Sequence, residues 1–189
     1  MSASEHSSRP WRIHEIAPDF RLEDVWALPT PGGPGDFPRL VAVGTRFDPG
    51  GGSSRIARAL FAVREGLGAL LGWDRDGSGL GARVPSLRDR LPADLRDAPL
   101  PETRDGSFRP VYMTGDELAL ELANRTVHGV LHLGWVPDGE GGWRGQMAIL
   151  VKPNGLLGRA YMLAIAPFRH TIVYPALLRD FGRAWERLR

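Results

Sequence analysis

The sequence predicts an α+β fold in which an antiparallel sheet, formed by the C-terminal half of the chain, is closed by a long amphipathic helix. Four alternating segments, at 108–114, 117–122, 126–136 and 143–152, are separated by turns rich in Gly, Asp and Asn. Such short connections join antiparallel strands. From Leu157 to Trp185, apolar residues then recur every three or four positions, which is typical of one face of a helix.

Two prolines interrupt this final helix. Pro167 and Pro175 each remove a backbone hydrogen bond, so we expect the helix to bend or split near them. The arginines of this segment, Arg179 and Arg183 among them, lie off the apolar positions and are expected to be exposed. A bent helix would suit a curved sheet.

The N-terminal half has weaker patterns. Alternation over 11–16 predicts a first strand followed by a turn of helix, and 40–47 predicts a second extended segment. After a serine cap, residues 53–72 carry apolar side chains at helical spacing and predict a helix. The polar segment 74–107 contains at most one short helix, at PSLRDRL. A connection this long is usually a functional lid, a surface arm or a mobile loop.

Composition indicates a single globular domain. The chain has 189 residues, of which 42% are hydrophobic and 24% charged, and this is enough to bury a proper core. We expect residues 1–10 to form a disordered or extended tail, and residues 11–189 to form one domain with a long arm at about 73–107.

Charge and residue usage exclude several classes of function. The net charge is only +2, with acidic residues interspersed among the arginines, which argues against a nucleic-acid partner. The chain has no cysteine, so disulfides and thiolate chemistry are excluded. It also lacks the patterns of a signal peptide, a membrane span and a glycine-rich phosphate loop. A cytoplasmic location and no cofactor are therefore expected.

His128 and His132 lie four positions apart in the segment VHGVLHLGW. Its valines and glycines favour a strand, on which residues four apart are separated by about 13 Å. Two imidazoles at that distance cannot bind one metal ion, whose bonds to nitrogen are about 2 Å long. No metal site is therefore predicted.

The alternation of this strand separates two faces. The odd positions are apolar and are predicted to pack under the final helix. The even positions, which include His128 and His132, either meet solvent or line a cavity between sheet and helix. Glu117 and Glu121 share one face of the preceding strand, and we expect that face to be solvated.

Three strings carry a family resemblance: NRTVHGVLHLGW, RGQMAILVKPNGLLGRAYM and PFRHTIVYPALL. With them the chain resembles an uncharacterised bacterial family, a domain of unknown function also found fused behind short-chain-dehydrogenase-like domains. The resemblance covers most of residues 11–187. It implies a START-like (SRPBCC, helix-grip) fold, in which an antiparallel sheet wraps a long C-terminal helix around an apolar cavity. The segments at 54–72 and 73–107 exceed a minimal domain of this kind and would cap or fill the cavity.

The leading hypothesis is a binding module for a small apolar molecule, held in a cavity between the sheet and the C-terminal helix. Apolar walls would supply the affinity and a few polar groups would orient the ligand. The candidate ligand-binding residues are Asn124, His128, His132, Arg159, Tyr161 and Phe168.

Two other functions stay open. The first is a cofactor-independent enzyme of the cyclase or dehydratase kind, with a histidine as general acid or base. The second is a protein-interaction module with a filled core, in which the arginines of the final helix contact an acidic partner. Of the three, noncatalytic binding is favoured.

Overall fold

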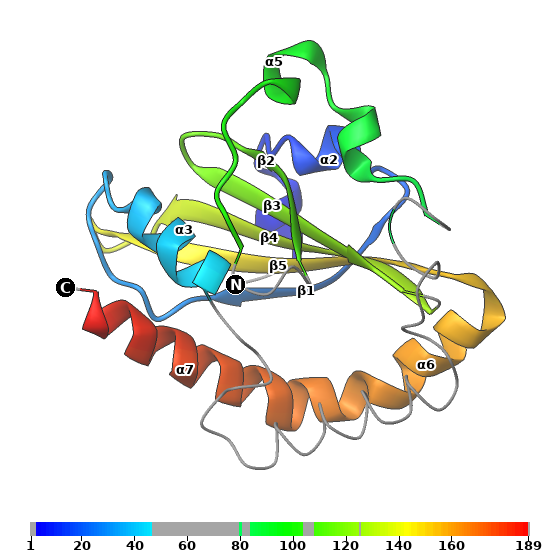
Figure 1. Cartoon of the computed structure of the whole chain (residues 1–189). Helices are drawn as coiled ribbons and strands as arrows, with labels where there is room; N and C mark the ends of the chain where they lie inside the picture. The colour runs from blue at the N-terminus through cyan, green and yellow to red at the C-terminus, as the bar shows by residue number, and fades with distance from the viewer. Residues whose placement is uncertain (1–2, 47–79, 81–83, 104–107, 125, 189) are drawn as a thin grey trace.

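A five-stranded antiparallel sheet forms the centre of the molecule (Figure 1). The structure is a computed structural model that describes residues 3–46, 80, 84–103, 108–124 and 126–188. The strand order is β1-β5-β4-β3-β2, so the four C-terminal strands form a meander and the first strand adds beside the last. The four strands predicted in the C-terminal half are confirmed. The strands are β1 (Arg21–Ala27), β2 (Arg109–Met113), β3 (Glu117–Ala123), β4 (Val127–Pro137) and β5 (Trp143–Pro153).

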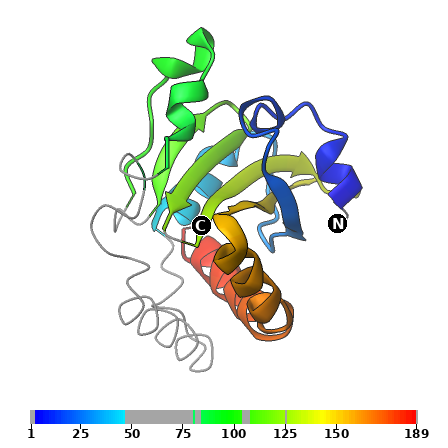
Figure 2. The same cartoon turned by 90° about the vertical axis from the view of Figure 1, so that its right-hand side faces the viewer.

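The predicted C-terminal helix is also confirmed, together with its interruption. Helix α6 (Gly155–Phe168) continues through a π-helical segment, η2 (Arg169–Val173), into α7 (Tyr174–Arg187). Pro167 lies at the end of α6 and Pro175 at the start of α7, so the irregular turn falls between the two prolines. Viewed nearly end-on, the helix runs along one side of the sheet (Figure 2).

The N-terminal segment corrects two expectations. The predicted strand over 11–16 is wrong: α2 (Ile13–Ile16) is helical, and the first strand begins at Arg21. Its apolar residues Ile13, Ile16 and Ala17 follow helical spacing and are all buried, which favours the helical turn. The tail expected over 1–10 instead contains α1 (Ala3–Ser7), which buries His6.

The second extended segment, predicted over 40–47, is also wrong. Residues Phe37–Arg46 form helix α3. Phe37, Leu40, Val41 and Gly44 are buried and recur at the i, i+3, i+4 and i+7 positions of one helix face. The helical spacing of these apolar residues therefore outweighs the preference of the β-branched residues in this segment for a strand.

The described part of the long arm contains two short helices, η1 (Leu87–Arg90) and α5 (Ala93–Arg96). The first confirms the short helix predicted at PSLRDRL, whereas the second shows that the prediction of at most one helix in this segment was wrong. Helix η1 begins where the Ser86 hydroxyl accepts a hydrogen bond from the Arg88 backbone N–H. The helix predicted at 53–72 lies outside the described residues.

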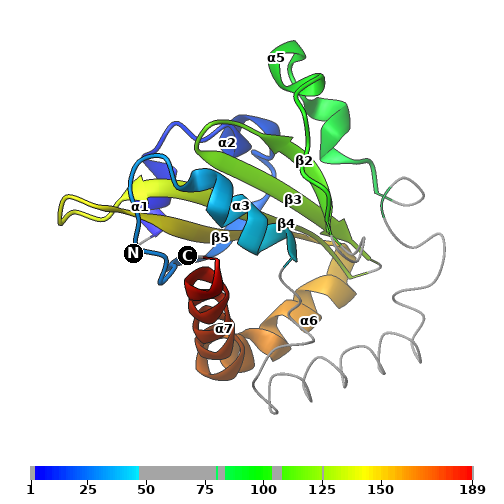
Figure 3. The same cartoon turned by 60° about the vertical axis from the view of Figure 1, so that its left-hand side comes forward.

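One face of the sheet, called here the helix face, packs against α3 and α7 (Figure 3). The prediction that the odd positions of β4 lie under the final helix is confirmed. The buried strand residues of this face include Leu118, Leu120, Leu133, Trp135 and Met147, and they contact Phe181 and Trp185 of α7.

The opposite face, called here the cover face, is enclosed by the N-terminal segment and by the arm at 86–96. Strand residues such as Ala119, Val130 and Leu150 share a buried cluster with Ile13 and Leu87. The expectation that this side of the sheet meets solvent is therefore wrong. Two segments distant in sequence build the cover, which alternation along one strand cannot reveal.

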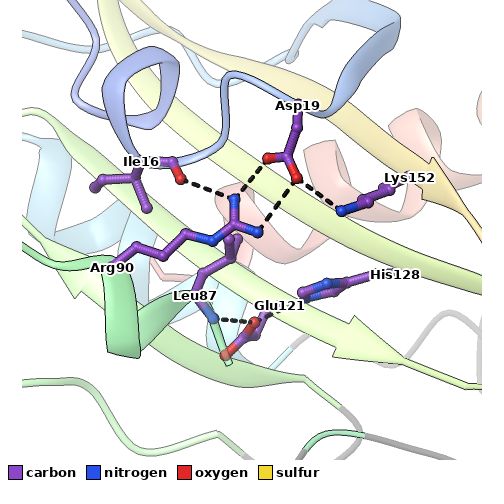
Figure 4. A network of polar contacts seen from close by, with 7 residues as sticks. All are labelled: Ile16, Asp19, Leu87, Arg90, Glu121, His128 and Lys152. Carbon is purple, nitrogen blue, oxygen red and sulfur yellow. Dashed lines mark hydrogen bonds and ion pairs between the residues drawn. The ribbon is translucent and has the colours of Figure 1, made fainter. Parts of the chain in front are cut away.

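Arg90 ties the two parts of the cover together (Figure 4). Its guanidinium donates to Asp19 at 2.5 Å and to the Ile16 carbonyl at 3.4 Å, while Lys152 of β5 donates to Asp19 at 2.8 Å. The hydrogen bond from Arg90 holds the pKa of Asp19 well below its usual range. Because these side chains are partly exposed, their role is to position the arm rather than to supply much stability.

A close contact within the cover provides a stability test. A Cβ atom on Gly134 would lie 2.8 Å from Cζ2 of the buried Trp11 ring, closer than real Cβ contacts. We expect Gly134→Val to lower the free energy of unfolding by about 1–3 kcal/mol through overpacking. Urea unfolding measures this, with Gly35→Val as a control, since a Cβ at Gly35 meets nothing within 4 Å. An unchanged midpoint for Gly134→Val would contradict the packing of Trp11.

Candidate functional site

Two polar clusters lie on opposite faces of the sheet. The first is on the cover face, where Glu117 accepts three hydrogen bonds. Its Oε1 accepts from the Arg12 backbone N–H at 2.9 Å, and its Oε2 accepts from the Tyr112 hydroxyl at 2.7 Å and lies 2.8 Å from His132 Nε2. Burial alone would raise the pKa of Glu117, but these hydrogen bonds, with His132 the largest contributor, outweigh it and lower the pKa.

His6 extends this cluster. A carboxylate can only accept, so His132 holds its proton on Nε2, and its Nδ1 accepts from His6 Nε2 at 3.1 Å. His6 Nδ1 is buried and has no hydrogen-bond partner in the described part of the chain. Burial, followed by the charges of His132, His14 and Arg9, lowers the pKa of His6 to about 3.

Glu121 and His128 form a second pair on the same face. His128 Nε2 lies 2.9 Å from Glu121 Oε2, which also accepts from the Leu87 backbone N–H at 3.0 Å (Figure 4). The Ser86 hydroxyl donates to the other oxygen of Glu121. Burial acts to raise the pKa of Glu121, and the hydrogen bonds, led by that with His128, lower it overall.

These pairs correct the expectations for this face. Glu117 and Glu121 are buried rather than solvated, and each holds the cover through backbone N–H groups. His128 and His132 lie on the side of the sheet away from α7, so they do not line a space between the sheet and the C-terminal helix. Both histidines are at most 2% exposed, which leaves no surface for a ligand.

The other predicted site residues are dispersed. Asn124 is buried at the turn between β3 and β4, where its Oδ1 accepts from Thr126 N and Val127 N. This is a turn-forming role. Arg159 is exposed on α6. The side chains of Tyr161 and Phe168 lie outside the described residues.

The second polar cluster lies on the helix face and centres on Asp24 of β1. Strand alternation would place Asp24 on the same face as Leu22, which pairs with Leu150 of the cover face. A β-bulge between Leu22 and Asp24 reverses this, and Asp24 pairs with Ile149 on the helix face. The bulge therefore directs a carboxylate toward the C-terminal helix.

The C-terminal helix supplies the partners of this carboxylate. The Tyr174 hydroxyl donates to Asp24 Oδ2 at 2.6 Å, and His170 Nε2 lies 3.2 Å from Asp24 Oδ1. The Trp26 ring lies beside both, with centroids 5.0 Å from Tyr174 and 6.3 Å from His170. His170 belongs to η2 and Tyr174 follows it directly. π-helical segments are rare and frequently lie at functional sites.

An apolar row extends from Asp24 across the helix face. The strand register aligns Asp24 with Ile149, and Ile149 with Leu131. Ile149 and Leu131 are only partly buried, whereas Met147 and Leu133 in the adjacent row are fully buried. The helix face therefore has a fully buried part beside α7 and a partly exposed part beside Asp24.

Gly129 of β4 adjoins this partly exposed part. A Cβ atom there would have Leu122 Cγ, at 3.9 Å, as its nearest described neighbour. Among the described residues, a Cβ atom at Gly129 would thus make only ordinary van der Waals contacts. Leu122 itself is partly buried.

A separate open pocket of about 740 Å³ lies between α3 and residues 101–103, lined by groups that include Val41, Thr45 and Glu102. None of the predicted site residues is among the described residues that line it. Within the described ranges, no group of three or more His, Asp or Glu side chains could hold a metal ion. None of the helices in the described part of the chain is long and apolar enough to cross a membrane.

Only part of the cluster formed by Asp24, His170 and Tyr174 could be predicted from the sequence. His170 and Tyr174 are four apart in the final helix, so their proximity was readable from spacing. The contact with Asp24 could not be predicted in this way, because the direction of the Asp24 side chain depends on the bulge.

Fold and site together define an α+β protein with an antiparallel sheet, a C-terminal helix on one face, and a carboxylate–tyrosine–histidine cluster between them. A family model described as "Protein of unknown function (DUF2867)" matches residues 16–176, and the chain belongs to this family. The matched region contains Asp24, His170 and Tyr174, whereas His6 precedes it. Neither curated proteins nor solved structures provide a match.

Proposed function

We propose that this protein binds a small apolar molecule between the helix face of the sheet and the C-terminal helix. The observation that carries the proposal is the partly exposed apolar row of Ile149 and Leu131, which leads to the polar groups of Asp24 and His170. Ligand sites commonly combine apolar walls with a few convergent polar groups. The ligand would place its apolar body along the row and a polar group at His170.

We propose further that the fold is the START-like helix-grip fold of the SRPBCC superfamily. In support, one long helix at the C-terminus lies along one face of a five-stranded antiparallel sheet (Figures 1 and 2). The polar groups of the ligand site differ from those first inferred from sequence. His170, Asp24 and Tyr174 take the place of His128 and His132, which the cover encloses.

Ligand binding is tested by native mass spectrometry of the purified protein and by thermal shift with fatty acids, aromatic ketones and phenols. A ligand present at 100 times its Kd adds about 2.7 kcal/mol to the free energy of unfolding. For a chain of this size, that corresponds to roughly 5–10 °C in Tm. We expect a copurifying apolar compound or a shift of this size.

Gly129→Leu tests whether the ligand binds at the proposed place on the helix face. The added side chain would project from the same face of β4 as Leu131, so we expect it to abolish the ligand-induced shift while the protein remains folded. Gly115→Leu, in an exposed turn with nothing within 4 Å of its Cβ, should leave the shift intact. An empty protein that no compound of the panel stabilises would overturn the proposal, as would full binding by Gly129→Leu.

A further inference from the structure

We propose that Asp24, His170 and Tyr174 form a general-base site, which removes a proton from the carbon next to a carbonyl group of the bound apolar ligand. This rests on the proposed function, because the ligand must lie along the row of Ile149 and Leu131 to reach His170. Two backbone irregularities, the bulge before Asp24 and the π-helical segment that carries His170, bring these groups together. Both kinds of irregularity are enriched beside active sites.

The geometry gives each group a distinct role. Asp24 is buried, with its side chain 4% exposed, and both of its oxygens are engaged, Oδ2 by Tyr174 and Oδ1 by His170. A carboxylate 3.2 Å from Nε2 favours the imidazole tautomer that carries its proton on Nε2. The basic lone pair of His170 is then on Nδ1. Tyr174 holds the carboxylate in place and is a positioning residue, as is Asp24.

Exposure distinguishes this histidine from those of the cover face. The His170 side chain is 49% exposed, whereas His128 and His132, which also pair with carboxylates, are enclosed. A general base must reach the proton it removes. Of these three carboxylate-paired histidines, His170 alone can approach a ligand without unfolding the cover.

The reaction needs no co-reactant. Nδ1 of His170 takes the proton as the C–H bond breaks, and the electron pair of that bond moves into the carbonyl group to give an enolate. The protonated imidazole then returns a proton to the same carbon or to another carbon of the enolate system. Charge and atoms balance, and the net result is proton exchange or the shift of a double bond.

Deuterium exchange measures this step directly. The probe is 2-tetralone, an apolar ketone with acidic α-protons, incubated with the full chain in D₂O and followed by proton NMR. We expect the protein to accelerate loss of the α-proton signals, and His170→Gln to reduce the protein-dependent rate by about 10²–10⁴-fold. His14→Gln is the matched histidine control and should exchange at the wild-type rate.

Asp24→Asn tests the positioning role. Without the carboxylate, the imidazole is no longer held with its proton on Nε2, so we expect the maximal exchange rate to fall while the 2-tetralone concentration that gives half of that rate stays unchanged. A merely structural role would raise that concentration or lower the folded fraction, and would leave the maximal rate per folded molecule unchanged. Wild-type exchange no faster than that of folded His170→Gln overturns the general-base proposal, whether or not 2-tetralone raises Tm. The ligand panel and Gly129→Leu separately decide the proposed function.

Discussion

Glu117→Ala is expected to lower the free energy of unfolding by about 3–5 kcal/mol, the range found when one partner of a buried pair is removed. The substitution leaves two buried donors, Tyr112 O–H and His132 Nε2–H, and the part-buried Arg12 N–H without their shared acceptor. An unsatisfied buried donor typically costs about 1–3 kcal/mol. Urea unfolding followed by tryptophan fluorescence measures the loss.

Glu140→Ala is the matched control, because Glu140 is exposed in the turn between β4 and β5. Substitutions of this kind usually change stability by less than about 0.5 kcal/mol. If Glu117→Ala lowers the free energy of unfolding by no more than Glu140→Ala does, then Glu117 does not hold the cover, and the hydrogen bonds around it do not stabilise the fold.

Acidification from pH 6.5 to 4.5 is expected to destabilise the protein through His6. The folded-state pKa of His6 is lowered to about 3, by burial first and then by the charges of His132, His14 and Arg9. In the unfolded chain His6 takes up a proton near pH 6.5, so the unfolded state binds more protons across this window. The free energy of unfolding therefore has its full value above pH 6.5. It decreases as the pH is lowered, by roughly 2–3 kcal/mol at pH 4.5.

His6→Phe isolates this effect, because phenylalanine retains an aromatic ring but does not titrate. Its free energy of unfolding should change less between pH 6.5 and 4.5 than that of the wild type, whatever its value at pH 7. Glu117 and Glu121, whose pKa values are lowered, lose their stabilisation only below about pH 4.5. Parallel pH curves for wild type and His6→Phe would rule out His6 as the cause.

The parts of the fold that depend on local alternation were predictable. Strands β2 to β5 alternate clearly and are joined by short polar turns, so their pairing follows from the chain itself. Prediction was wrong at α2 and α3, where β-branched and aromatic residues favour a strand but the spacing of apolar residues is helical. In α3 the spacing of Phe37, Leu40, Val41 and Gly44 was the better guide, because it matches the face buried on β4 and α7.

The ligand site between the sheet and the final helix stays a proposal. His128 and His132, the two histidines named for it, lie on the opposite face of the sheet. His128 and His132 stand out in the sequence because they share a strand with apolar neighbours. Their partners, Glu117 and Glu121, also belong to the sheet and make both histidines part of the buried cover face.

By itself, the sequence determined the strand meander, the long helix that follows it and the two-sided character of β4, because these depend on residues close together in the chain. The tertiary structure decided which face is covered and which polar groups meet. His6 contacts His132 across 126 positions, and Tyr174 contacts Asp24 across 150. The physical reason is that side-chain direction follows local periodicity only in regular elements. A bulge and a π-helical turn change the direction of the Asp24 and His170 side chains. A cover built from distant segments determines which polar groups are buried away from water.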